Sequence, residues 1–213
     1  MTDSRTTPIE ADHFYHIYNR GINGGNIFKS DRNYSFFLNK IFQHLTPVCD
    51  VYAYCLMPNH FHLLVRIKSD FELESLVKVL NLDKAPKATQ AQTGLHSPQN
   101  IFSKQFARIF NSYSQAFNKE NKRHGALIES PFKRKLITSE TYLINAVIYI
   151  HRNPQSHFKN CSYSEYSYSS YQTILNSEKT LLKRDEVFEL FGNRENFIES
   201  HKIPADFDEK FDL

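Results

Sequence analysis

The feature that most constrains the fold is a nine-residue segment, Met57-Pro58-Asn59-His60-Phe61-His62-Leu63-Leu64-Val65. Its second half is typical of a β-strand, and two imidazoles stand at positions i and i+2 of that strand. Successive strand side chains point to opposite faces of a sheet, so His60 and His62 share one face and Phe61 takes the other. Such a strand can offer two nitrogen ligands to one metal ion, while Phe61 anchors the strand in the core. The segment therefore predicts a sheet with a two-histidine metal site on one face.

Strand and helix signals alternate along the chain. Strands are predicted over 13–19, 48–56 and 60–67, and short strand signals lie within 126–137. Helical spacing of apolar residues covers 31–45, 71–82 and 101–118, and a last helix runs from a Thr138 or Ser139 cap to about Asn153. The short link Pro58-Asn59 makes the strands beside it antiparallel neighbours. The order predicts an α+β fold, a ferredoxin-like antiparallel sheet with helices on one side.

Chain length bounds the domain organisation. The 213 residues, 40% of them hydrophobic, suffice for one domain with a packed core plus an appendage. We expect a catalytic domain over residues 1–172 and a short helical appendage over 173–213. Residues 83–100 are polar, rich in Thr and Gln and interrupted by proline and glycine, and are predicted to form a flexible insertion.

Composition excludes several protein classes. The three cysteines (Cys49, Cys55 and Cys161) are odd in number and form no C-x-x-C pair, which argues against a disulfide framework or a zinc ribbon. No apolar run approaches the ~20 residues of a transmembrane helix, and the polar start of the chain lacks a signal segment. We therefore expect a cytoplasmic protein with no membrane partner. A net charge of +3 permits an anionic partner without demanding one.

The helix predicted to end near Asn153 carries the second set of chemical groups. At about 100° per residue, one side is apolar enough to dock on the sheet, and Tyr149 and Asn153 are neighbours on the polar side. Pro154 disfavours helical geometry at Asn153, so the helix is expected to end there, with the Asn153 oxygen available to a metal. With the two histidines, these residues suggest a metal-assisted tyrosine nucleophile acting on a phosphodiester.

Three blocks of the sequence carry a family resemblance. They are Tyr15-His16-Ile17-Tyr18-Asn19-Arg20-Gly21, the segment from Ala53 to Val65, and Tyr149-Ile150-His151-Arg152-Asn153-Pro154, with Ser169-Ser170-Tyr171 as a trailer. Over residues 14–171 the chain resembles the single-tyrosine HUH transposases of the insertion-sequence type, in particular the REP-associated tyrosine transposases and their RayT-like relatives. The Met-Pro-Asn-His-x-His block is highly specific for this family.

The resemblance implies the HUH transposase fold and a role for each matching residue. His60 and His62 would ligate Mg²⁺ or Mn²⁺, and Asn153 would be the third ligand, standing where related transposases use glutamine. Tyr149 would be the catalytic nucleophile. The implied reaction is metal-dependent cleavage and strand transfer of single-stranded DNA through a covalent 5′-phosphotyrosine intermediate. Metal affinity should be weak, because Mg²⁺ prefers oxygen ligands and Mn²⁺ accepts imidazole more readily.

The expected partner is single-stranded or hairpin DNA, with the protein associated with the nucleoid when bound. The candidate DNA contacts are cationic side chains that would neutralise phosphates: Arg20, Lys133, Arg134, Lys135 and Arg152. Related transposases include both monomers and homodimers. Either state, with the tyrosine acting in its own chain or in its partner's, is compatible with the sequence.

The chain departs from the family pattern in three places. Gln155 follows Asn-Pro where relatives usually have an apolar residue, and 125–134 lacks a clear Gly-His-x-Phe-Gln-x-Arg motif. The third departure is the insertion over 83–100. The last two concern the choice of DNA sequence more than catalysis.

Three other functions are consistent with the same residues. The first is a non-catalytic binding protein for structured repeat DNA. The second is a metallophosphoesterase that uses a bound water in place of Tyr149 and releases product without a protein–DNA adduct. The third is an interaction module in which His60→Ala changes neither metal nor DNA behaviour.

Overall fold

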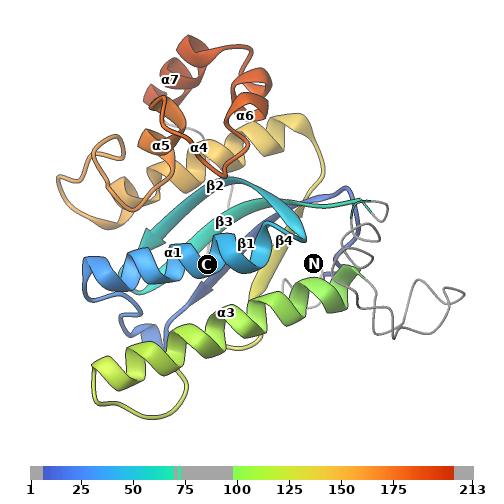
Figure 1. Ribbon diagram of the computed structural model, residues 1–213. Helices are drawn as coiled ribbons and strands as arrows, with labels where there is room; N and C mark the ends of the chain where they lie inside the picture. The colour runs from blue at the N-terminus through green and yellow to red at the C-terminus, as the bar shows by residue number, and fades with distance from the viewer. Residues whose placement is uncertain (1–6, 70–71, 73–97, 204–213) are drawn as a thin grey trace, which may run out of the picture.

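The sheet has four antiparallel strands in the order β2-β3-β1-β4. The computed structural model describes residues 7–69, 72 and 98–203. The strands are β1 (Phe14–Arg20), β2 (Cys49–Met57), β3 (His60–Ile67) and β4 (Lys133–Ile137), as Figure 1 shows. β2 and β3 pair across the Pro58-Asn59 turn, as the short link predicted. The α+β class is confirmed.

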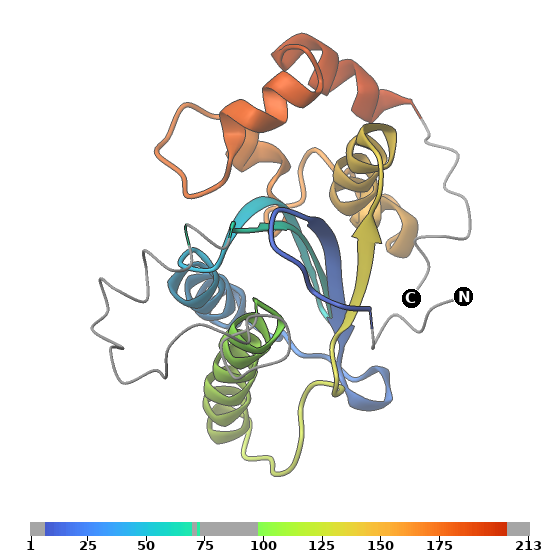
Figure 2. The same ribbon diagram turned by 90° about the vertical axis from the view of Figure 1, so that its right-hand side faces the viewer.

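Helices cover both faces of the sheet. Figure 2 shows α1 (Asp31–Leu45, blue) and α3 (Pro98–Glu120, green) on one side and α4 (Glu140–His157, yellow) on the other. The prediction that the helices lie on one side therefore holds for α1 and α3 only. The physical reason is the alternation of β3: its apolar side chains need cover on one face, and its histidines face α4 on the other.

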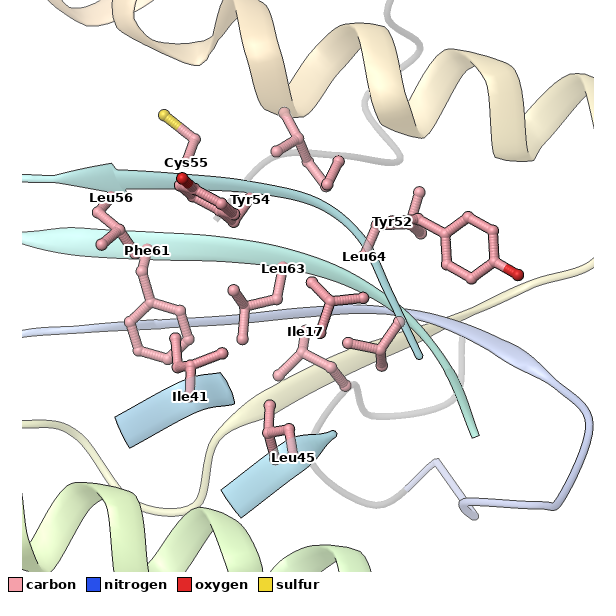
Figure 3. Close-up of a cluster of buried hydrophobic side chains, with 14 of the residues drawn as sticks. Ile17, Ile41, Leu45, Tyr52, Tyr54, Cys55, Leu56, Phe61, Leu63 and Leu64 are labelled. Atoms are coloured by element: carbon pink, nitrogen blue, oxygen red, sulfur yellow. The ribbon is translucent and has the colours of Figure 1, made fainter. Parts of the chain in front are cut away.

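One part of the core lies between the sheet and α1. Ile17, Phe61 and Leu63 point from the strands toward Ile41 and Leu45 of α1 (Figure 3), and all five are buried. Rings from both helices cover Phe61, because its centroid lies 5.1 Å from that of Phe37 and 5.9 Å from that of Phe110. Phe61 thus anchors β3 as the sequence predicted, and it fixes which face the flanking histidines occupy.

A glycine turn holds the start of β3 in place. It contains the short helix η1 (Ile22–Gly24). A Cβ at Gly21 would lie 1.9 Å from the Gly25 carbonyl oxygen, so no larger residue fits without moving the backbone. The Gly21 N–H donates to the Asn59 carbonyl oxygen (2.8 Å). The glycine-rich segment of the sequence therefore braces the residue that precedes His60.

The C-terminal helices pack on β2 and α4. They are α5 (Tyr171–Leu175), α6 (Arg184–Leu190) and α7 (Arg194–Lys202). Ser169 pairs with Cys55, and Leu182 pairs with Val51, which attaches this segment to the edge strand. α5 runs across the boundary expected between residues 172 and 173.

Some predictions fall on residues outside the described part of the chain. The predicted helix over 71–82 and the predicted insertion over 83–100 lie almost entirely there, although α3 already begins at Pro98. Cys49, Cys55 and Cys161 are free thiols. Within the described ranges, no helix has both the length and the apolar character to cross a membrane.

Candidate active site

The two histidines of β3 face α4. His60 and His62 are 3% and 0% exposed, and their ring centroids lie 5.1 Å apart at 89°. Across the sheet, Tyr18 of β1 pairs with His62, and Arg20 pairs with His60. The shared face predicted from the i and i+2 spacing is therefore present.

His60 is held by amides on both sides of its ring. Its Nδ1 lies 2.7 Å from Asn59 Oδ1, and its Nε2 lies 3.0 Å from Asn153 Oδ1. The Asn59 amide nitrogen donates to the Gly24 carbonyl oxygen (3.4 Å), so Asn59 Oδ1 is the acceptor for a proton on His60 Nδ1. With the His60 proton on Nδ1, Nε2 has a lone pair on the side that faces Asn153 Oδ1.

The His60–Asn153 separation fits two ligands of one metal ion. Two cis ligands held about 2.1 Å from an octahedral cation lie about 3.0 Å apart. His62 is the candidate for a third donor, because its Nε2 is buried and has no hydrogen-bond partner among the residues that the structure describes. Among the residues that the structure describes, no three His, Cys, Asp or Glu side chains gather as a metal-binding group. Two imidazoles and one amide are therefore the candidate donors, a set that Mn²⁺ accepts more readily than Mg²⁺ does.

Tyr149 lies beside the histidines of its own chain. Its ring centroid is 5.5 Å from that of His62, at 88°, and 5.8 Å from that of His16, at 74°. Ser139 caps α4 by accepting from the Tyr142 N–H (3.2 Å), which sets the helical register of Tyr149 and Asn153. The helix thus delivers a phenol and a carboxamide to the same end of β3.

The predicted end of α4 at Asn153 is wrong. α4 continues to His157 with Pro154 inside it, and the Phe158 N–H donates to the Pro154 carbonyl oxygen (2.9 Å). Proline only biases its predecessor away from helix, and Asn153 and Pro154 are both buried here, so packing outweighs that bias. The extra turn places the centroid of the His157 ring 4.9 Å from that of the His60 ring. Helical spacing from Asn153 would have found His157 had Pro154 not been taken as a stop.

The cationic run on β4 divides between the two faces of the sheet. Lys133 and Lys135 lie over the Tyr18 ring, with Nζ 5.7 and 5.8 Å from its centroid, on the histidine face. Arg134 points to the other face, is 5% exposed, stacks on Phe132 and donates to the Thr7 carbonyl oxygen. The expectation that Arg134 contacts DNA is therefore not supported, because strand alternation buries it.

Arg20 and Arg152 have partners within the fold. Arg20 Nε donates to Glu129 Oε1 (2.7 Å) at a partly exposed position. The Arg152 guanidinium donates to the carbonyl oxygens of His201 (2.6 Å) and Ile203 (3.1 Å). Arg152 therefore ties α4 to the end of α7, whereas Arg20 stays beside His60 across the β1–β3 pair.

Burial keeps the site histidines neutral. It lowers the pKa of His60 to about 4, with a smaller contribution from His157. Burial, aided by the Lys135 charge, lowers the pKa of His16 to about 3. Burial also holds the pKa of His62 well below its usual range, and the neighbouring His16, His60 and His157 add to the effect. Neutral imidazoles are the form that binds metal, so these lowered pKa values favour the metal-binding form at pH 7.

The same shifts predict a loss of stability in mild acid. An unfolded histidine takes up a proton below about pH 6.5. Folded His60 and His201 do so only near their lowered pKa values of about 4. Between these values the unfolded state binds more protons than the folded state. The free energy of unfolding therefore decreases as the pH is lowered, by up to about 1.4 kcal/mol per pH unit for each histidine. Urea unfolding at about pH 7 and about pH 5 would measure this, and equal stability at both would contradict it.

Comparisons with known proteins point to one family. The family model described as "Transposase IS200 like" matches residues 11–119, just over half of the 213 residues. No curated protein sequence matches the chain. The chain is also similar to a solved structure described as "Structure of the REP associates tyrosine transposase bound to a REP hairpin". That match has a TM-score of 0.54 and 14% sequence identity, and it covers 85% of this chain and 90% of the other. The resemblance to insertion-sequence transposases found in the sequence is confirmed.

Proposed function

The chain belongs to the IS200-like transposase family, and from this premise we propose that it cleaves and rejoins single-stranded DNA through a covalent bond to Tyr149. The main support is a single arrangement in one chain. The Tyr149 ring, the unpartnered His62 Nε2 and the His60–Asn153 pair all meet where α4 crosses the start of β3. The meeting of these four residues within one chain supports a site in which Tyr149 acts beside the histidines of its own chain.

Tyr149 needs help to act as a nucleophile. A phenol with an ordinary pKa of about 10 is protonated at pH 7, so its proton must be removed or its anion stabilised. A divalent cation held by His60, His62 and Asn153 would supply this stabilisation and would polarise the phosphate. The Tyr149 oxygen then attacks phosphorus in line and its proton passes to solvent. The P–O3′ bond breaks and O3′ takes a proton from solvent, which leaves a 5′-phosphotyrosine and a 3′-hydroxyl.

The reverse reaction joins strands without an external energy source. A different 3′-hydroxyl attacks the phosphotyrosine, forms a new phosphodiester and returns the phenol. One tyrosine therefore supports one break and one join. Stoichiometric, tightly bound zinc in the purified protein would instead favour a hydrolase, because zinc activates water readily.

The test of the proposed function is adduct formation. Purified protein is incubated with single-stranded hairpin DNA and Mn²⁺ and then denatured. We expect a band that carries both protein and the 5′ end of the cleaved product. Cleavage without such a band would favour the metallophosphoesterase, and binding without cleavage would favour the repeat-binding protein.

Lys133 and Lys135 are the proposed phosphate contacts beside the site. Replacing both with glutamine should weaken DNA binding and reduce the slope of log affinity against log salt by about 1.4, since each contact to a single strand contributes about 0.7. Lys40→Gln with Lys104→Gln is the matched control, since these lysines lie on α1 and α3 across the sheet. Titrations at several salt concentrations would show this, and equal slopes for the two variants would argue against the contacts.

A further inference from the structure

We propose that His16 is a positioning residue, which holds His62 in the tautomer that binds metal. This proposal rests on the proposed function, because it assigns a purpose to a metal ligand. His16 lies on β1, outside the nucleophile and the ligand set, and no step described above uses it.

The contact between the two histidines is short and fully buried. His16 Nε2 lies 2.8 Å from His62 Nδ1, and both side chains are 0% exposed. The ring planes differ by only 19°, which allows an in-plane N–H···N hydrogen bond. His16 pairs with Leu64 and Tyr18 pairs with His62, so the bond runs diagonally between β1 and β3.

The chemistry of this bond fixes one proton. A neutral imidazole carries its proton on one nitrogen and a lone pair on the other. If His62 Nδ1 donates to His16 Nε2, the lone pair of His62 is on Nε2, the atom that is buried without a hydrogen-bond partner. If the proton were on Nε2, that atom would have no lone pair and could not bind metal. His16 therefore selects the ligand form of His62, as partners of metal-binding histidines commonly do.

Aromatic packing holds His16 in this orientation. The Tyr18 ring stacks on it with centroids 5.0 Å apart at 27°, and the Tyr149 ring meets it edge-on. Its acceptor atom is thus fixed by the sheet before any metal arrives. We therefore expect His62 to bind a metal ion with little reorientation of its ring.

A matched pair of substitutions separates this role from packing. Methionine and glutamine have similar lengths, but only glutamine carries an oxygen that can accept from His62 Nδ1. We expect H16M to weaken Mn²⁺ binding about 10–100-fold and H16Q to lie much closer to wild type. Free Mn²⁺ is measured by electron paramagnetic resonance without DNA, so the readout does not depend on turnover. Thermal melting checks that both variants are folded.

The outcomes distinguish this proposal from the proposed function. If wild type binds Mn²⁺ and folded H16M binds it equally well, the positioning role is overturned while the metal site stands. Loss of cleavage with unchanged Mn²⁺ affinity would also overturn it and would make His16 a partner of Tyr149 instead. If wild type binds no Mn²⁺, the metal-dependent function fails and this proposal with it.

A measurement on the unaltered protein covers the case in which H16M does not fold. Long-range nitrogen–proton NMR of metal-free wild type reports which ring nitrogen of His62 is protonated. We expect the proton on Nδ1. A proton on Nε2 would overturn the proposal.

Discussion

Replacing Tyr149 with phenylalanine is expected to abolish the covalent protein–DNA adduct, because the substitution removes the only oxygen of that side chain. Cleavage should fall by at least about a thousandfold, as when other enzymes lose a nucleophile. Hairpin DNA binding should remain close to wild type, since the ring and its contacts with His62 and His16 are retained. Denaturing gels would measure the adduct, and titration with labelled DNA would measure affinity.

Tyr142→Phe is the matched control for this variant. Tyr142 lies on the same helix two turns earlier and is also partly buried, but Ser139 and the start of α4 are its neighbours in the chain. It should retain adduct formation. If the adduct survives Tyr149→Phe and disappears in Tyr142→Phe, the nucleophile is Tyr142 and the assignment to Tyr149 is overturned.

Replacing His62 with alanine is expected to have the second-largest effect. It removes the imidazole whose Nε2 is buried without a partner, and with it one of three proposed metal ligands. Loss of a cation that contributes a few kcal/mol to the transition state corresponds to a drop in cleavage of about a hundredfold or more. Mn²⁺ affinity should fall in parallel, and extra Mn²⁺ should restore only part of the activity.

The control for His62→Ala is His44→Ala on α1, on the far side of the sheet. It should leave Mn²⁺ affinity and cleavage close to wild type. Because His62 is buried, melting curves must first show that the alanine variant is folded. A folded His62→Ala protein with unchanged Mn²⁺ affinity would remove His62 from the metal site.

Local periodicity accounts for what the sequence predicted correctly. The strand period of two placed His60 and His62 on one face with Phe61 opposite, and the helical period aligned Tyr149 with Asn153. Neither conclusion needs knowledge of distant contacts. The same strand period, applied to β4, would also have placed Arg134 on the face opposite to Lys133 and Lys135.

The remaining features depend on tertiary contacts that no local pattern encodes. The His16–His62 bond requires the register of β1 against β3, which joins residues 46 positions apart. The last turn of α4 forms because burial outweighs the local bias of Pro154, and that burial, which the sequence does not show, is what places His157 beside His60. The presence of helices on both faces of the sheet likewise follows from the packing of α4 on the face that carries the histidines (Figure 2).

The residues between Tyr149 and Asn153 bind the C-terminal segment. His151 Nδ1 lies 2.8 Å from His201 Nε2 of α7, and its Nε2 lies 2.7 Å from the Ser170 hydroxyl; all three side chains are buried. Swinging α4 away from the sheet would therefore expose two neutral imidazoles and sever the Arg152 contacts at once. The helix that carries Tyr149 is therefore held in place by the C-terminal segment. In the proposed cycle of breaking and joining, we therefore expect α4 to keep its place while the DNA ends exchange.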